Sequence, residues 1–368
     1  MRFNFKGTVG AVTDPTAEKG YFLREGHTSS GAPYASVNFR VSSDKNNAGF
    51  VEMFGMANDT IKTTDTNNQP MSVRWDDRND PDVVKDVAGY RKNQINLSDS
   101  EQHTFIAALD AIQLLREKIP DMVGKEFVFT GNVNKDFYNG KARDKFQISN
   151  IYPFKESDKP KLTISGEFFY NKDSIDDSDW KDEHKLTING WTQEYIKDKK
   201  KRMYYERTII FDCAKIDFTK AAQKSAAEYR LKQLGITLDG DKIKNGLKSG
   251  KIYKIPVVLS YINGNKEVEF DESELTENQK EAIELGLKTL DDFRPKDAKI
   301  YGDKVSYYKL IDYDLRGEFS DGAITLDDSE DEFMEQVYVI PSMDSGETAD
   351  GFMTVPENSD DDIVDLFG

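Results

Sequence analysis

The chain has 368 residues, with 67 Asp and Glu against 50 Lys and Arg and a pI near 4.8. A single cysteine, Cys213, excludes a disulfide framework and a Cys-based zinc site, and three scattered histidines argue against a multi-His metal site. No apolar run approaches the roughly 18 residues of a membrane span, and Met1–Lys6 does not resemble an apolar signal region. We therefore expect a soluble, cytoplasmic protein that needs no metal or cofactor and has no membrane partner.

The charge is distributed unevenly along the chain. Residues 317–368 hold 16 Asp and Glu and no Lys, Arg or His, which leaves 51 acidic against 50 basic residues in residues 1–316. The body is close to neutral, so its cations are able to gather on one face. An acidic run of this kind has too little apolar surface to form a core against its own repulsion. We expect residues 317–368 to be a largely disordered interaction tail.

The first half of the chain begins with strand patterns. Alternating apolar residues predict strands over residues 3–12, 34–41 and 50–56. Residues 58–93 are polar and interrupted by prolines, which predicts a long loop with little fixed structure.

A helix and a hairpin follow in the predicted order. Ser98 and Glu101 match a capping box before an apolar repeat at helical spacing, so we expect a helix from Ser98 that ends at Pro120. Strands over 124–129 and 146–151 are predicted to form a hairpin with Asn139-Gly140 in its turn. Three strands, a helix and a hairpin are the element order of an OB-fold.

The second half repeats this order. The pattern predicts strands over 162–170, 185–195 and 203–211, a helix over 218–234, and a hairpin of 255–261 and 267–270 around Asn263-Gly264. Residues 271–316 are expected to extend this unit with a helix over 273–290 and strands over 300–313. The predicted fold class is therefore mainly β with a few helices: two OB-like barrels, residues 1–156 and 157–316, and a disordered acidic C-terminal tail.

Basic and aromatic residues are interleaved at several predicted loops and hairpins. Proteins that hold single-stranded nucleic acid need cations along the phosphates and flat side chains for unstacked bases. The candidate DNA-binding residues are Arg40, Trp75, Tyr138, Lys141 and Arg143 in the first unit, and Trp191, Tyr195, Lys200, Arg202, Tyr204, Tyr205 and Arg207 in the second. The alternative interpretation is that these are soluble hairpin tips whose aromatic residues belong to the strand core.

The chain end carries a resemblance to a known family. Asp360, Asp361, Asp362 and Ile363 followed by Leu366-Phe367 resemble the acidic, apolar-tipped tail of single-stranded DNA-binding proteins of phages and bacteria. Val364-Asp365 interrupts the match, no proline precedes Phe367, and Gly368 follows it. The resemblance implies that these tail residues recruit a polymerase, helicase, primase or nuclease. It also implies a host-cytoplasmic location if the chain is phage-encoded.

These patterns predict a non-catalytic, sequence-tolerant binder of single-stranded DNA in phage or bacterial DNA replication, recombination or repair. Sixteen tethered carboxylates beside a basic groove would also compete with DNA for that groove. The alternative is a β-rich virion or structural protein whose acidic tail keeps it in solution.

Overall fold

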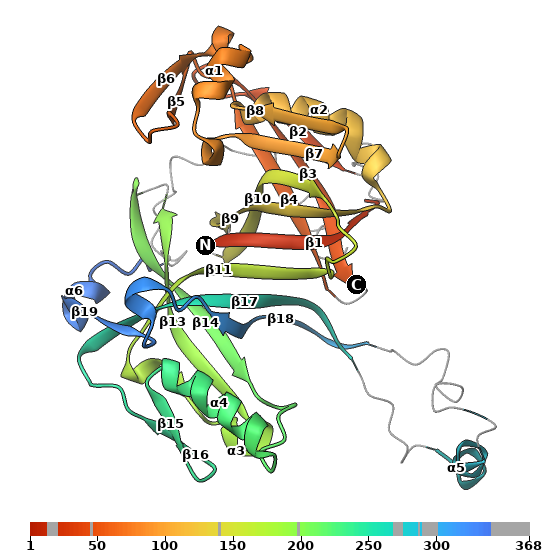
Figure 1. Cartoon of the computed structure of the whole chain (residues 1–368), viewed down its shortest axis with the longest axis vertical. Helices are drawn as coiled ribbons and strands as arrows, with labels where there is room; N and C mark the ends of the chain where they lie inside the picture. The colour runs from red at the N-terminus through yellow and green to blue at the C-terminus, as the bar shows by residue number, and fades with distance from the viewer. Residues whose placement is uncertain are drawn as a thin grey trace, which may run out of the picture.

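The structure of the protein is a computed structural model that describes residues 1–12, 21–44, 47–138, 141–196, 199–267, 275–285, 288 and 301–339. Two β-barrels lie one above the other along the long axis, as Figure 1 shows. In the part of the chain described, no helix has the length and apolar content needed to cross a membrane.

The first barrel has five strands. They are β1 (Arg2–Gly10), β3 (Pro33–Asp44), β4 (Asn47–Met56), β9 (Glu126–Tyr138) and β10 (Lys141–Pro153). Strand β1 pairs with β3 and β9, β3 with β4, and β9 with β10, and the barrel closes through a parallel pair in which Phe146 of β10 lies opposite Val51 of β4. This pairing order is that of an OB-fold. Helix α2 (Ala108–Met122) buries Ile112 and Leu115 in the same core.

The second barrel repeats the pairing order strand for strand. Its strands are β11 (Lys161–Tyr170), β13 (Lys185–Ile196), β14 (Lys201–Asp212), β17 (Lys251–Glu267) and β18 (Tyr301–Tyr313). The closing parallel pair joins β14 to β18, with Ile209 opposite Tyr308. Helix α4 (Ala221–Gln233) packs Leu231 into the core, where Cys213 is also buried, and burial raises the pKa of that thiol to about 11. The prediction of two OB-like barrels in a mainly β fold is confirmed.

Smaller elements decorate the second barrel. They are β12 (Ile175–Asp176), α3 (Trp180–Glu183), and the hairpin of β15 (Ile236–Asp239) and β16 (Lys242–Asn245). Helix α5 (Glu277–Glu284) lies apart from the barrel in Figure 1. The remainder of the helix predicted over 273–290 lies largely outside the described residues.

The fifth strand of the second barrel is not the predicted one. A turn at Asn263-Gly264 was expected, but β17 runs straight through both residues, which lie opposite Ser306 and Val305 of β18. The fifth strand is therefore β18, which comes from the segment predicted to be only an extension. Pairing with a distant strand has overridden the local turn preference of Asn-Gly.

The predicted loop over 58–93 is in fact a folded insert, seen at the top of Figure 1. Strands β5 (Thr60–Thr64) and β6 (Pro70–Arg74) form a hairpin, which is followed by α1 (Pro81–Asp86) and two short 3-10 turns at 75–77 and 89–91. Val73, Val87 and Ile106 make a small buried core of their own. The insert is therefore an ordered unit attached to the first barrel.

The predicted helix start at Ser98 is also wrong. Residues around it form a hairpin of β7 (Asn93–Ser98) and β8 (Glu101–Phe105), in which the Glu101 N–H donates to Ser98 Oγ at 3.1 Å across the turn. A serine hydroxyl that accepts a hydrogen bond from the N–H three residues later stabilises a tight turn as well as a helix start. Helix α2 begins at Ala108, and Pro120 lies inside it.

The two barrels are joined by their first strands and by a buried ion cluster. Strands β1 and β11 pair antiparallel from Arg2 opposite Ser165 to Lys6 opposite Lys161. Asp144 of β10 lies in contact with Arg207 of β14 at 3.0 Å and with Lys135 of β9 at 2.9 Å. The hydroxyl of Tyr308 also donates to Asp144, so this carboxylate is fixed by groups from both barrels.

The acidic segment folds further than its composition predicts. After a 3-10 turn at 317–319, β19 (Ile324–Ser329) pairs with β17 and leads into the short helix α6 (Glu330–Met334). We call residues 324–339 the strap. The expected boundary at residue 317 therefore differs from the structure, which includes residues 317–339 in the second barrel unit. Residues 340–368, with the predicted partner motif at Asp360–Phe367, lie outside the described residues.

Candidate nucleic-acid interface

The first barrel exposes aromatic side chains on the outer side of β3 and β4 and of the neighbouring strand β2 (Phe22–His27), a surface we call the first face. Because Val37, Phe39 and Val51 point into the core, the residues that alternate with them point outward. Two ring pairs result, Phe22 with Phe50 and Tyr34 with Phe54, each with centroids 6.0 Å apart.

These side chains are accessible, and arginines lie beside them. Phe54 is 38% exposed and Met56 is 37% exposed, which is unusual for large apolar side chains on a strand. Arg24 of β2 and Arg40 of β3 are exposed on the same face, and no carboxylate of the described residues pairs with either. Lys145 is paired with Glu52 at 2.6 Å. Two cations with no carboxylate partner among the described residues, beside two pairs of aromatic rings, are suited to a polyanion with flat groups.

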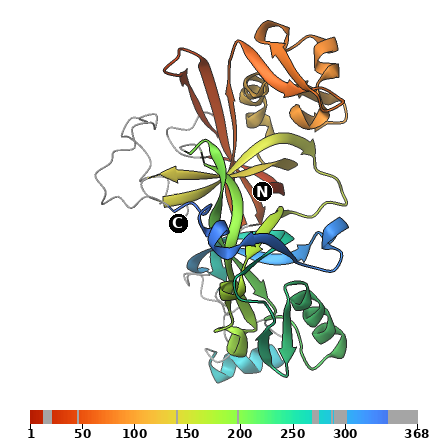
Figure 2. The same ribbon diagram turned by 90° about the vertical axis from the view of Figure 1, so that its left-hand side faces the viewer.

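The second barrel has the equivalent surface on β13 and β14, which we call the second face. Trp191 and Tyr204 point outward from these strands, but Phe333 of α6 lies on top of them. The Phe333 ring centroid is 4.1 Å from that of Tyr204 and 5.3 Å from that of Trp191. Figure 2 shows the strap, in blue, lying across the green strands of the second barrel. The second face is therefore covered by the chain itself.

Backbone hydrogen bonds hold the strap in place. The Tyr204 N–H donates to the Gln336 carbonyl at 3.0 Å, and the Tyr338 N–H donates to the Tyr204 carbonyl at 2.7 Å. Tyr338 packs on Ile196 and Met203 near the end of the β13–β14 hairpin. The strap thus forms an isolated parallel β-bridge between Val337 and Tyr204 at the edge of β14, and packs Phe333 and Tyr338 beside it.

Two of the predicted DNA-binding residues of the second unit are buried. Arg207 is 4% exposed, donates to both oxygens of Asp144 at 3.1 and 3.0 Å and also lies 3.5 Å from Glu194. Burial favours a raised pKa for Asp144, but the charges of Arg207 and Lys135 outweigh it and hold the pKa of that carboxyl below its usual value. We therefore correct the assignment of Arg207 to an internal ion partner. Trp191 is 8% exposed beneath Phe333 and belongs to a buried aromatic cluster.

The other predicted residues of this unit lie near the end of the β13–β14 hairpin. Tyr195 is 58% exposed, and Lys200 and Arg202 are exposed beside it. Tyr204 is half-buried under Phe333, and Tyr205 is half-buried with the Lys135 ammonium 4.9 Å from its ring centre. The structure therefore leaves the hairpin end accessible while the strap covers the strands behind it.

The predicted residues of the first unit are only partly brought together. Arg40 lies on the first face, and Arg143 is exposed on β10. Tyr138 and Lys141 are opposite each other in the β9–β10 pair, but their side chains lie outside the described residues. Sequence reasoning missed Phe22, Tyr34, Phe50 and Phe54. The signal for the last two was the run from Phe50 to Met56, where Phe50, Phe54 and Met56 place large apolar side chains on the side that also holds Glu52 and is opposite to the buried Val51 and Met53.

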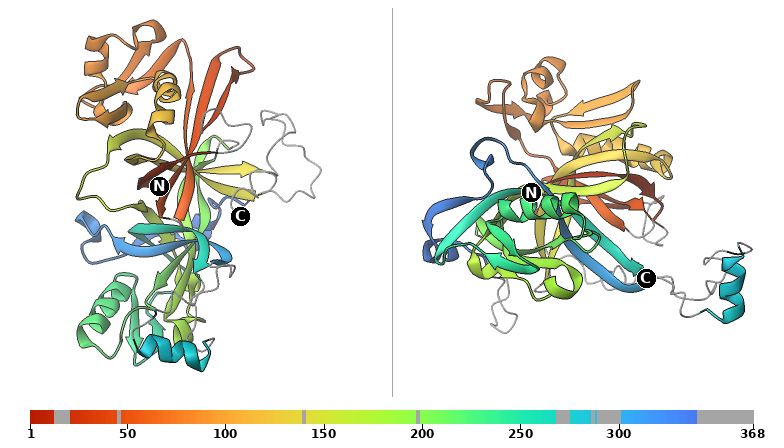
Figure 3. Two further views of the ribbon diagram at one scale, coloured as in Figure 1. Left: turned by 90° about the vertical axis from the view of Figure 1, so that its right-hand side faces the viewer. Right: turned by 60° about the horizontal axis from the view of Figure 1, so that its bottom comes forward.

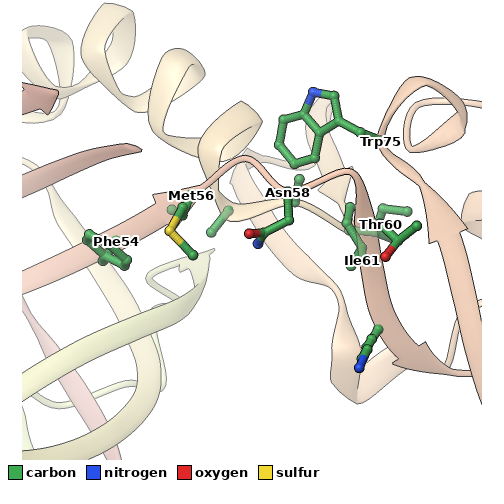
Figure 4. A pocket seen from close by; sticks show the side chains of 11 residues that line it. Phe54, Met56, Asn58, Thr60, Ile61 and Trp75 are labelled. Carbon is green, nitrogen blue, oxygen red and sulfur yellow. The ribbon is translucent and has the colours of Figure 1, made fainter. Parts of the chain in front are cut away.

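Trp75, the remaining predicted residue, lines a hollow of about 560 Å³ between the first barrel and the insert, shown in Figure 4. Its lining comes from the end of β4, Asn58, the start of β5, Trp75, and the segment that leads into α2 with its first residue: Phe54, Gly55, Met56, Asn58, Thr60, Ile61, Lys62, Trp75, Ile106, Ala107 and Ala108. Arg78 covers the Trp75 ring, with its guanidinium carbon 4.1 Å from the ring centroid.

The comparisons with known proteins are weak. No protein-family model matches the chain, and no curated protein sequence does. Two crystal structures of the single-stranded DNA binding protein from Thermus aquaticus are similar to 74% of this chain. The wild-type protein has 8% identity and a TM-score of 0.24 with 98% of its chain covered, and a deletion mutant has 10% identity and a TM-score of 0.25 with 97% covered. Similarity at this level assigns neither a fold nor a function to this chain. The OB-fold is assigned from the strand pairing.

Proposed function

We propose that the protein binds single-stranded DNA without sequence preference and without catalysis. The observation that carries this proposal is the first face, where the exposed Phe54 and the half-buried rings of Phe22, Tyr34 and Phe50 lie beside the exposed Arg24 and Arg40. Stacking of a base on an aromatic ring contributes about 1–3 kcal/mol and tolerates any base, because every base has a π-face. Duplex DNA keeps its bases stacked on one another, so exposed rings of this kind favour a single strand.

The strap occupies the second face, which is where we expect the acidic segment to compete with DNA. The Phe333 ring lies over Tyr204 at an interplanar angle of 30°, where a base would stack, and Glu330, Asp331 and Glu332 precede it in the chain with negative charge. Among the described groups, the Trp191 indole N–H is buried under the strap with no hydrogen-bond acceptor, and such a group costs about 1–3 kcal/mol. We therefore propose that the strap is a displaceable mimic of a strand on the second face.

The wider role belongs to the same proposal. A protein that coats exposed strands serves DNA replication, recombination or repair in a phage or bacterium, and the tail residues from Asp360 to Phe367 would recruit a polymerase, helicase, primase or nuclease. Support for this part is the resemblance of the tail motif. Pull-down of such enzymes by the full chain, and loss of capture with Phe367→Ala, is the expected result.

Titration with oligo-dT at several salt concentrations tests the binding proposal. We expect affinity to fall with salt with a slope of about −0.7 for each phosphate contacted. Oligo-U serves as the comparison that separates DNA from RNA. Absence of binding to either at low salt would overturn the proposal and leave the structural-protein alternative.

A further inference from the structure

We infer that the hollow lined by Trp75 is a pocket for one unstacked nucleobase, where the strand leaves the first face. This inference deepens the proposed function and depends on it. Figure 4 shows Trp75 facing the segment that runs from Met56 through Asn58 to Ile61. The volume of about 560 Å³ lies within the range of about 300–1,000 Å³ typical of small-ligand sites.

The Trp75 wall is held in position before any ligand arrives. Arg78 donates from Nε and Nη2 to the two oxygens of Asp110 at 2.8 and 3.1 Å, and from Nη1 to the Trp75 carbonyl at 2.8 Å. Its guanidinium covers the Trp75 ring and does not line the hollow. Because the first residues of α2 hold Asp110, the barrel fixes the orientation of a ring that belongs to the insert. A fixed ring loses little entropy when a base stacks on it.

The hollow is continuous with the first face. Phe54 and Met56 belong to both surfaces, since they point outward from β4 and also line the hollow. A strand stacked on Tyr34 and Phe54 therefore reaches the hollow without leaving the protein.

The rest of the lining fits a base and its backbone. Ala107 and Ala108 have small side chains that leave the space open. Asn58 and Thr60 supply hydrogen-bonding groups at the wall, and the exposed Lys62 lies where a phosphate would follow the base. This combination of one aromatic wall, a few polar groups and a cation is the chemistry of a nucleotide site.

An aromatic side chain would also fit the hollow, and Phe367 of the same chain is the rival occupant. Negative charge adjoins it at Asp365 and Asp360–Asp362, so tail and strand share the chemistry of an anion carrying a flat group. We assign the site to the strand because the hollow continues a surface that carries exposed rings and arginines. The two occupants are separated by testing Trp75 variants with and without Phe367→Ala.

The experiment measures oligo-dT affinity and tryptophan quenching of the full-length protein. Trp180 is 3% exposed, and Trp191 is 8% exposed only while the strap covers it, so the quench is measured in a Trp191→Phe background, where Trp75 is the tryptophan that a base is expected to quench. Trp75→Leu keeps an apolar side chain but removes the π-face, and we expect binding about 5- to 150-fold weaker and the quench lost. Trp75→Phe should restore most of the affinity. The matched control is Tyr90→Ala, because Tyr90 is a 64% exposed aromatic residue of the same insert that hydrogen-bonds to Thr64 and Asn68, away from the hollow.

The outcomes separate this inference from the proposed function. If the wild-type protein does not bind oligo-dT, the proposed function fails and takes this inference with it. If the wild-type protein binds and Trp75→Leu binds equally well, only the pocket is overturned. An equal loss in Trp75→Leu and Trp75→Phe would also overturn it, since packing alone would then account for the effect. If the loss disappears in the Phe367→Ala background, the hollow holds the tail and the assignment to a base is wrong.

Discussion

The two barrels share one strand order but differ in what lies on their outer faces. On the first barrel, the rings of Tyr34 and Phe54 are accessible, and on the second barrel Phe333 covers Trp191 and Tyr204. Figure 3 shows the insert, in orange, and the strap, in blue, on the two different barrels. The fold alone therefore does not determine whether an OB face is available. Segments added to the barrels determine which face is accessible. On the second barrel the added segment is the acidic strap, which lies beside the basic end of the β13–β14 hairpin.

The comparison depends on the two barrels being one unit, and breaking the ion cluster between them should have the largest effect. We expect Asp144→Asn to lower the free energy of unfolding by about 3–5 kcal/mol at neutral pH, because Lys135 loses its carboxylate partner in a buried setting and Arg207 keeps only Glu194, at 3.5 Å. The folded-state pKa of Asp144 is lowered, so the stability it provides is present above about pH 4 and is lost as pH falls through that lowered pKa.

Denaturant unfolding of both proteins from pH 7 downward measures this. The difference between wild type and Asp144→Asn should shrink in acid. Glu25→Gln is the control, because it breaks an exposed pair with Arg116 and should cost no more than about 1 kcal/mol. A difference that stays constant with pH would contradict the assigned charge state.

Removing the cover from the second face should expose Trp191 and Tyr204, so that both barrels present accessible aromatic rings. Phe333→Ala removes a fully buried ring, which weakens the attachment of the strap by about 3–5 kcal/mol. We expect faster hydrogen exchange at Tyr204 and Tyr338 and tighter oligo-dT binding at low salt. Met334→Ala is the matched control, since Met334 is the next residue of α6 and is 45% exposed. Faster exchange with unchanged affinity would separate the strap from DNA binding.

Removing a ring from the first face should have a smaller effect and should weaken binding. For Phe54→Ala we expect a loss of about 1–3 kcal/mol in oligo-dT affinity, with little change in stability because the side chain is 38% exposed. Tyr229→Ala on α4 removes a 59% exposed aromatic ring from the second barrel and serves as the control. Equal losses in both variants would show that the first face is not the binding surface.

Single cations should produce the smallest change and show how far the strand extends. Arg40→Gln on the first barrel and Arg202→Gln on the hairpin of the second should each reduce the magnitude of the salt slope by about 0.7 if each contacts a phosphate. Measuring the slope with long and short oligo-dT distinguishes the two barrels. A reduction with Arg40→Gln alone would confine the strand to the first barrel.

The sequence predicted the barrels well because strands with one buried side alternate every two residues, as Val37, Phe39 and Val41 do. It failed where a distant partner decides the outcome. The local preference of Asn263-Gly264 predicts a turn. The pair lies within strand β17 because β18 pairs with it there. The candidate site was predicted in part for the same reason. Trp191 and Tyr195 share a strand and a face, and only the position of Phe333, far away in the chain, buries one and leaves the other exposed.

The acidic segment shows a second limit of composition. Residues 317–339 contain no Lys, Arg or His, and average charge predicts that they stay solvated. Phe333 and Tyr338 nevertheless find apolar surface that other segments provide, and each is at most 6% exposed. A few well-spaced aromatic residues are enough to order an acidic segment when the surface that receives them is already folded.

The pairing of β1 with β11 has a consequence for how the protein is made. Arg2 must find Ser165, and Phe3 must find Gly131, before the first strand has neighbours on both edges. Contacts this distant in sequence slow folding. The N-terminal strand therefore emerges from the ribosome long before β9 and β11 are synthesised. A fragment that stops at residue 156 lacks β11, so one edge of β1 stays open to other chains. Each barrel has the complete strand order of an OB-fold, but during synthesis the two depend on each other.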